Sequence, residues 1–147
     1  MWRALSPTRS SPNSSKRLCT DTAHAEIAGE VTQLIDALET YGHEIEGDGT
    51  DDPSHPIVTS RLAMFALRRT PPTTYTPYAT TPPIIRIPYV WFADDVGDDL
   101  AVVMLMGDKT ELKNRWYPTR VQHIETSLVP GWQRANPTHH ARVRRTR

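Results

Sequence analysis

Residues 84–110 read IIRIPYVWFADDVGDDLAVVMLMGDKT, and this stretch decides the fold. Residues 84–93 are rich in β-branched and aromatic residues, and residues 100–106 are almost all apolar, which is typical of buried strands. The acidic turn between the two runs contains Gly97, which can adopt the positive φ that a tight turn needs. We therefore predict an antiparallel hairpin, whose second strand is covered on both faces and lies inside the sheet.

Pro88 interrupts the first strand of this hairpin. A proline has no N–H group to donate to a sheet ladder, so prolines in sheets are found at edges or at bulges. The sequence therefore predicts an edge position or a bulge at Pro88.

Two further elements are predicted upstream of the hairpin. Over residues 24–41, apolar residues recur every three or four positions, which predicts a helix with one apolar face. Asp21 or Thr22 can cap the start of this helix, and Gly42 follows its end. Residues 61–68 mix apolar and basic residues and are predicted to form a third strand.

A last helix is predicted near residues 118–129, where Pro118 suits the first turn and the apolar residues fall on one side. Pro130 and Gly131 are expected to end it. The order helix, strand, strand, strand, helix predicts an α+β fold, in which a small antiparallel sheet carries helices packed on it.

The length of 147 residues leaves room for one domain. We expect this domain to cover residues 23–132, between a disordered leader over residues 1–22 and a flexible basic tail over residues 133–147. Residues 44–56 and the Pro/Thr-rich residues 71–83 are expected to form loops, because prolines and glycines interrupt both segments.

The net charge of zero hides an uneven distribution of charge along the chain. Residues 21–60 contain ten acidic residues and no Lys or Arg, whereas residues 61–147 contain 13 basic and seven acidic residues and carry a net charge of +6. Such a chain can present a basic face to phosphate groups, although an ordinary mixed surface explains the distribution equally well.

Several kinds of function lack their sequence signals. The chain has no glycine-rich phosphate loop, no GxSxG motif and no HExxH motif. The six histidines show no ligand spacing, so we expect neither a metal site nor a cofactor. Cys19 is the only cysteine, and no apolar run approaches the roughly 18 residues that a membrane helix needs. We therefore expect a soluble cytoplasmic protein with no membrane partner.

Basic residues gather at the ends of the predicted strands or within them: Arg68, Arg69, Arg86 and Lys109. Arg86 is unusual, because an arginine inside an apolar strand must either reach a polar concavity or pair with an acid such as Asp108 or Glu111. From the spacing alone, both interpretations of Arg86 stay open.

These residues also carry a resemblance to a known family. From residue 84 onward, a strand with an interior arginine leads through an acidic turn, an apolar strand and a Gly-Asp-Lys loop to a Trp-Tyr pair before the last helix. Upstream, the predicted helix in VTQLIDALETYGHEI ends in a Tyr-Gly pair, and the predicted strand in RLAMFALRR ends in Leu-Arg. In this pattern the chain resembles RelE-superfamily toxins of the HigB type over roughly residues 25–130.

The resemblance implies the toxin of a toxin–antitoxin pair, an endoribonuclease that cleaves messenger RNA on the ribosome. In that reaction the ribose 2′-hydroxyl attacks the adjacent phosphorus, and no metal ion is required. Arg86 and Lys109 are expected to contact the phosphate, because one well-placed donor stabilises developing negative charge by about 2.7–4 kcal/mol. Tyr117 is expected to stack on a base or to transfer a proton, and the general base is unassigned.

The remaining basic residues are expected to contact RNA phosphates: Arg68, Arg69, Lys113, Arg115 and Arg120. The partners implied are messenger RNA on the ribosome, ribosomal RNA and a cognate antitoxin, which in this family is usually a helix-turn-helix protein. Two alternatives stay open: a non-enzymatic relative of the toxins that bind DNA gyrase, and an inactive copy that only binds its antitoxin.

Overall fold

The computed structural model describes residues 4–5, 22–49, 51–69, 84–108 and 112–144. A seven-stranded sheet has the order β1-β5-β4-β3-β2, and β6 and β7 pair with opposite ends of β4. The strands are β1 (Ala4–Leu5), β2 (Ser54–Pro56), β3 (Met64–Arg69), β4 (Ile85–Ala93), β5 (Asp99–Val103), β6 (Gly107–Asp108) and β7 (His140–Ala141). All pairs are antiparallel except β1–β5. The predicted α+β class, with helices on a small and mostly antiparallel sheet, is confirmed.

Strands β4 and β5 form the predicted hairpin, in which Ala93 pairs with Asp99. Gly97 in the turn has a φ of 90°, a conformation that favours glycine. Residues Leu100 and Val103 are buried, as are the two residues between them, so β5 is apolar on both faces as expected. The centre of the sheet is nevertheless β4, which pairs with β3, β5, β6 and β7.

Pro88 is fully buried in the middle of β4, where we expected a sheet edge or a bulge. Pairing with β3 is uninterrupted, and Ala66 lies opposite Pro88. The Pro88 carbonyl accepts a hydrogen bond from the Met104 amide at 2.9 Å. In an antiparallel ladder the N–H and C=O of one residue face the same neighbour, so the missing donor faces the segment after β5.

The irregularity that the proline requires is found in that neighbouring segment. Tyr89 pairs with Val103, and Arg86 pairs with Gly107. Two residues separate the paired positions in β4, but three residues separate them in the segment between β5 and β6. The extra residue is the signature of a bulge. The expected bulge therefore lies opposite Pro88 rather than in β4 itself.

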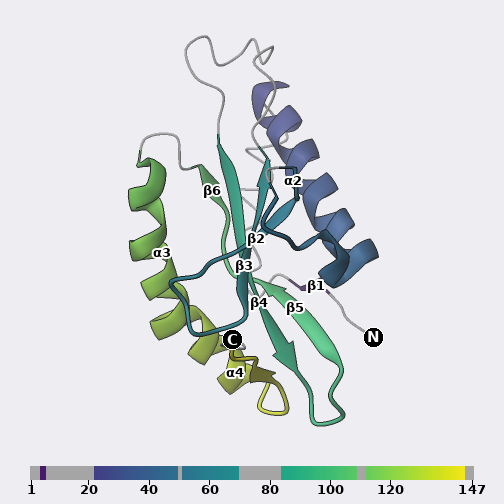
Figure 1. The fold of residues 1–147 in the computed structure, drawn as a ribbon, viewed down its shortest axis with the longest axis vertical. Helices are drawn as coiled ribbons and strands as arrows, with labels where there is room; N and C mark the ends of the chain where they lie inside the picture. Colours follow the sequence, from purple (N-terminus) through teal and green to yellow (C-terminus); the bar gives the residue numbers. More distant parts are fainter. Residues whose placement is uncertain (1–3, 6–21, 50, 70–83, 109–111, 145–147) are drawn as a thin grey trace.

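Helix α2 (Thr22–Tyr41) covers one face of the sheet (Figure 1), which confirms the first predicted helix. Its buried residues Leu34 and Leu38 pack with the β3–β5 side chains of that face. Gly42 follows with a φ of 56°, as expected of a residue that ends a helix. The next residues form the short turn η1 (Gly42–Ile45) and then β2, where we expected an uninterrupted loop.

The opposite face is covered by four consecutive helical segments (Figure 1): η2 (Lys113–Arg115), α3 (Trp116–His123), the π-helical η3 (Ile124–Leu128) and α4 (Val129–Ala135). The prediction that Pro130 and Gly131 end this helix is wrong. The Val129 amide donates to the carbonyl of Ile124, five residues earlier. This wider turn lets the helix continue past a proline that has no N–H to donate.

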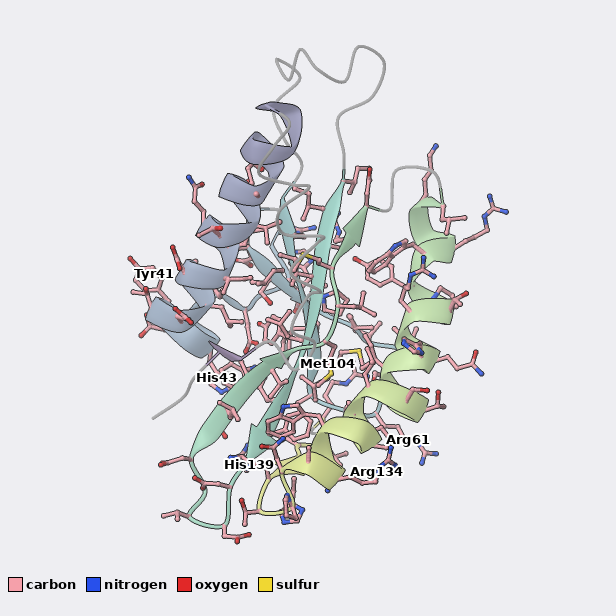
Figure 2. The ribbon with its side chains drawn as sticks, turned by 180° about the vertical axis from the view of Figure 1, so that it is seen from behind. Tyr41, His43, Arg61, Met104, Arg134 and His139 are labelled. Carbon is pink, nitrogen blue, oxygen red and sulfur yellow. The ribbon has the colours of Figure 1, made fainter. Side chains whose placement is uncertain are left out.

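The core on this face lies between α3–α4 and the sheet. Met104, which is fully buried there, is labelled in Figure 2. Trp132 packs on Phe92 with ring centroids 4.5 Å apart. In the part of the chain that the structure describes, no helix combines the length and the apolar composition needed to cross a membrane.

Both expected tails contribute to the sheet. Ala4–Leu5 forms β1, so the expected disorder of the leader is wrong for these residues, and residues 6–21 lie outside the described ones. The boundary between the domain and a flexible tail at residue 133 is also wrong. The helix continues to Ala135, β7 pairs with the end of β4, and the Arg142 amide donates to the Trp91 carbonyl at 2.8 Å. The expected loop over residues 71–83 lies outside the described residues.

Candidate anion-binding site

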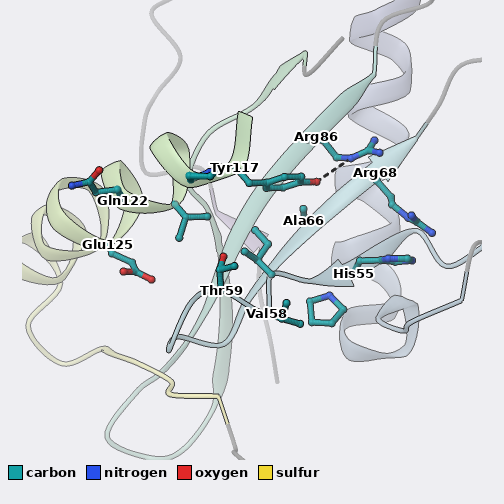
Figure 3. Close-up of a pocket in the computed structure, with 13 residues that line it drawn as sticks. His55, Val58, Thr59, Ala66, Arg68, Arg86, Tyr117, Gln122 and Glu125 are labelled. Carbon is teal, nitrogen blue, oxygen red and sulfur yellow. Dashed lines mark hydrogen bonds between the residues drawn. The ribbon is translucent and has the colours of Figure 1, made fainter. Parts of the chain in front are cut away.

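A pocket of about 590 Å³ lies on the α3 side of the sheet (Figure 3). Its floor is formed by side chains of β2, β3 and β4, and its walls by α3 and by the turn that follows β2. Arg68, Arg86 and Tyr117 line it, so three of the residues expected from the sequence converge on one concavity.

Arg86 and Arg68 form a directly opposed pair across β4 and β3. Arg68 and Arg86 each lie two residues from the paired Ala66 and Pro88, so the side chains of both pairs are on the same face of the sheet. Both arginines line the pocket. Side chains opposed in this way have Cβ atoms about 5 Å apart, and like charges there oppose folding. A pair of opposed cations therefore forms one end of the pocket.

Arg86 is 7% exposed, although arginine is a residue type that is rarely buried. Its Nε donates to the Tyr117 hydroxyl at 3.1 Å, and its Nη1 donates to the Ile85 carbonyl at 2.8 Å. Among the residues that the structure describes, no carboxylate forms an ion pair with it. Asp108, a partner that the sequence suggested, instead accepts a hydrogen bond from the Ile84 amide, and Glu111 lies outside the described residues. The geometry thus supports the interpretation in which Arg86 reaches a polar concavity rather than pairing with Asp108.

Arg68 is held by two backbone carbonyls at the rim of the pocket. Its Nε donates to the Asp52 carbonyl at 3.2 Å and its Nη2 to the Gly49 carbonyl at 2.9 Å. Burial first, and then the nearby Arg86 cation, lower the pKa of Arg68. The charges of Arg68 and Arg86 therefore act on each other, and an anion bound between them would relieve the repulsion.

Tyr117 reaches the pocket because Trp116 fixes the start of α3. A Cβ atom at Gly107 would lie 2.9 Å from Cζ2 of Trp116, so only glycine lets β6 approach the indole this closely. The ring of Tyr117 packs edge-on against Trp116, with centroids 5.3 Å apart. Gly107 of β6 and the Trp-Tyr pair are therefore linked by direct packing.

His55 also lines the pocket, and sequence reasoning missed it. It pairs with Ala66 across β2 and β3, next to Arg68. Its Nε2 lies 2.6 Å from the Gly49 carbonyl, an acceptor, so Nε2 carries the proton. In the neutral ring, Nδ1 then keeps its lone pair. The one available signal was a histidine near a predicted basic strand, which is weak.

Compared with family models, curated proteins and solved structures, the chain shows no match.

None of the other predicted site residues is among the described residues that line the pocket. Lys109 lies outside the described residues, as does the side chain of Arg69. Lys113 and Arg115 are exposed before α3 and do not line the pocket. The guanidinium of Arg120 lies 5.6 Å from the centroid of the Trp116 ring, which suits a cation–π contact.

Two guanidinium groups, a phenol and an imidazole share one concave site. Guanidinium groups match the geometry of phosphate oxygens, and a buried arginine with neutral partners keeps its charge available to a ligand. Imidazole can accept or release a proton. The arrangement is suited to binding a phosphate ester and to moving a proton beside it.

Proposed function

We propose that this protein is a metal-independent endoribonuclease and the toxin of a toxin–antitoxin pair, of the RelE/HigB type. The observation that carries the proposal is the opposed pair Arg68 and Arg86, in which Arg86 is almost fully buried and, among the described residues, bonds to neutral groups. Burying a cation in this way is costly unless a ligand supplies the opposite charge.

In the proposed reaction, the ribose 2′-oxygen forms a bond to the adjacent phosphorus, and the bond from phosphorus to the 5′-oxygen of the next nucleotide breaks. The products are a 2′,3′-cyclic phosphate and a 5′-hydroxyl, whose oxygen takes its proton from water as the bond breaks. Arg68 and Arg86 bind the non-bridging oxygens, whose negative charge increases as the 2′-oxygen attacks. Donors fixed before the reaction stabilise such charge without reorganisation.

His55 is the proposed acceptor of the 2′-hydroxyl proton. Its protonated Nε2 is bonded to Gly49, so Nδ1 is the nitrogen left to act as a base. The Tyr117 hydroxyl accepts a hydrogen bond from Arg86, and it orients that guanidinium while its ring forms part of the wall. Lys109 remains a predicted phosphate contact.

Action on the ribosome, a cytoplasmic location and an antitoxin partner rest on the sequence resemblance. Within the proposal, the exposed Lys113 and Arg115 beside α3 contact ribosomal RNA phosphates. Such contacts make binding weaker as the salt concentration rises.

The test is to induce the chain in bacterial cells and to map new messenger RNA ends together with protein synthesis. We expect translation to stop and cuts to appear in translated messages. Purified protein and ribosomes should give the same cuts in EDTA. DNA damage without RNA cuts would instead support a gyrase-binding toxin, and normal growth would support an inactive copy.

A further inference from the structure

The end of the pocket farthest from the arginines carries a negative charge. Glu125 lines the pocket from the π-helical segment η3, and Figure 3 shows its carboxylate on the opposite side of the pocket from Arg68 and Arg86. The pocket therefore has a cationic end and an anionic end.

Ser60 holds this carboxylate in position. The Ser60 hydroxyl donates to Oε1 of Glu125 at 2.5 Å. Ser60 is only 2% exposed, and its own oxygen accepts a hydrogen bond from the Leu62 amide at 3.1 Å. The orientation of Glu125 is thus fixed by a buried residue, as expected of a group arranged before a ligand binds.

Glu125 is half-buried and has no cationic partner among the described residues. Its described hydrogen bond reaches Oε1, which leaves Oε2 with acceptor capacity toward the pocket. A tie between the turn and the helix explains Ser60. A neutral acceptor could make the same hydrogen bond with Ser60, and Oε2 of Glu125 has no hydrogen bond to a described residue. The tie therefore does not explain why residue 125 is a carboxylate.

The wall between the two ends is mostly apolar, with Thr59 and Gln122 as polar members. Tyr117, Val121 and Glu125 are spaced four residues apart along α3 and η3, and all three line the pocket. Eight residues of helix advance by about 12 Å, which is comparable with the distance from the phosphate of a nucleotide to the far edge of its base. Ile57 and Val58 contribute the facing side chains from the turn after β2.

We propose that this end of the pocket is a base subsite that selects guanine. The proposal rests on the proposed function, because it takes the ligand to be a nucleotide whose phosphate lies between Arg68 and Arg86. Guanine presents two adjacent donors on its Watson–Crick edge, N1–H and the N2 amino group, which match the two oxygens of a carboxylate.

The other bases fit a carboxylate poorly. Adenine and cytosine place a ring acceptor next to their amino group, and the acceptor would face the charged oxygen. Uracil has one donor, N3–H, between two carbonyl oxygens. Proteins recognise single-stranded RNA by hydrogen bonds to the Watson–Crick edges of its unpaired bases. Glu125 can therefore distinguish guanine when a base is turned into the pocket.

Titration of the full chain with guanosine 3′,5′-bisphosphate, adenosine 3′,5′-bisphosphate and inorganic phosphate tests the proposal by calorimetry. We expect guanosine bisphosphate to bind roughly 10-fold or more tightly than the adenosine compound, in line with one good bidentate contact. Glu125→Gln keeps an acceptor for Ser60 and should abolish the preference while phosphate binding is unchanged. Glu39→Gln, which removes an exposed acid from α2, is the matched control.

Each outcome decides between the two proposals. Equal affinities for the two bisphosphates, or a preference that survives in Glu125→Gln, would overturn the base subsite. A guanine preference without RNA cleavage in cells would uphold the subsite and reject the nuclease. RNA cuts without any preference for guanine would uphold the nuclease alone.

Discussion

Arg68 and Arg86 oppose each other directly across β3 and β4, on the sheet face that α3 covers. Two cations in this relationship repel each other. Burial lowers the pKa of Arg68 most, and the nearby Arg86 cation lowers it further. A sheet chosen for stability alone would place an apolar pair or an ion pair there. An anion bound between the two guanidinium groups would reduce this repulsion.

The first prediction separates activity from stability at Arg86. Arg86→Met keeps much of the side-chain volume and removes the charge, so RNA cleavage should fall by at least about 100-fold. The free energy of unfolding should stay the same or rise by about 0.2–1 kcal/mol, because the repulsion from Arg68 is relieved. Mapped RNA ends and urea unfolding measure the two effects.

Arg134→Met is the matched control, because Arg134 is exposed on α4 and does not line the pocket (Figure 2). It removes the same charge and should leave cleavage within a factor of about two. Full activity in Arg86→Met would remove the assignment of the site.

The second prediction concerns His55. His55→Ala should lower the cleavage rate by about 100-fold or more, the usual contribution of a general base, with RNA binding unchanged. Added imidazole should restore part of the rate, because a free base can enter the space left by the ring. The measurement is a single-turnover rate with and without imidazole. A rate that falls only because RNA binding is lost would assign His55 a structural role.

The hairpin of β4 and β5 could be predicted because its information is local. Two apolar runs and Gly97 specify the strands and the turn, and the structure pairs them as expected. The end of α2 was also readable, since the apolar period and Gly42 lie within one segment. Where local preferences and tertiary packing agree, sequence reasoning succeeds.

The site itself depends on information that is not local. The opposition of Arg68 and Arg86 follows from the register of β3 on β4, which the burial of two whole faces determines. His55 lies on a strand of three residues within an acidic, glycine-containing segment, so no periodic pattern predicted this strand or the position of His55 on it. The helix likewise continues through Pro130 because of a π turn, which the sequence does not signal.

The third prediction concerns Glu46, a buried carboxylate on the α2 side. Its Oε2 accepts hydrogen bonds from the Tyr89 hydroxyl at 2.5 Å and from Nε1 of Trp91 at 2.7 Å. Burial, followed by the charge of Glu46, raises the pKa of Tyr89. Glu46→Ala removes the acceptor of both donors and should lower the free energy of unfolding by about 1–3 kcal/mol in urea.

Glu39→Ala serves as the control for Glu46→Ala, because Glu39 is exposed on α2. It should change the free energy of unfolding by no more than about 0.5 kcal/mol. Equal effects of the two substitutions would show that the buried carboxylate contributes nothing specific.

The fourth prediction is a pH dependence at the turn of the hairpin. The pKa of Asp94 is lowered, first by its hydrogen bond from the Asp98 amide (2.9 Å) and also by that from the Val96 amide (3.0 Å). A carboxyl group with a lowered pKa in the folded state stabilises the fold above its unfolded pKa of about 3.9. That contribution is lost as the pH falls through the lower, folded value.

Amide hydrogen exchange at Asp98 and Val96 measures this effect. Protection in the wild type should decrease between about pH 4 and pH 2, the range below the unfolded pKa. Asp94→Asn, whose amide oxygen does not titrate, should show a smaller change over the same range. Identical pH profiles would remove Asp94 as the cause.

The last prediction tests whether the C-terminal residues belong to the domain. A chain that stops after Ala135 loses β7 and with it the pairing to Phe92 and Ala93. It also loses the hydrogen bond from Nε of Arg142 to Asp99 (2.5 Å). Two backbone hydrogen bonds of Arg142 are lost as well: its amide donates to the Trp91 carbonyl, and its carbonyl accepts from the Ala63 amide. Because each hydrogen bond contributes about 0.5–1.5 kcal/mol, the free energy of unfolding should fall by about 2–5 kcal/mol.

Removing only residues 145–147 is the control for this truncation, since every contact named for the truncation involves residues 140–144. Urea unfolding of both chains gives the comparison. If the longer truncation unfolds at the same urea concentration as the full chain, residues 136–147 contribute nothing to the stability of the domain, as expected of part of the flexible tail predicted over residues 133–147. A lower midpoint for that truncation alone would show that the end of β4 requires β7, because without it the amide and carbonyl groups along that edge lose their partners.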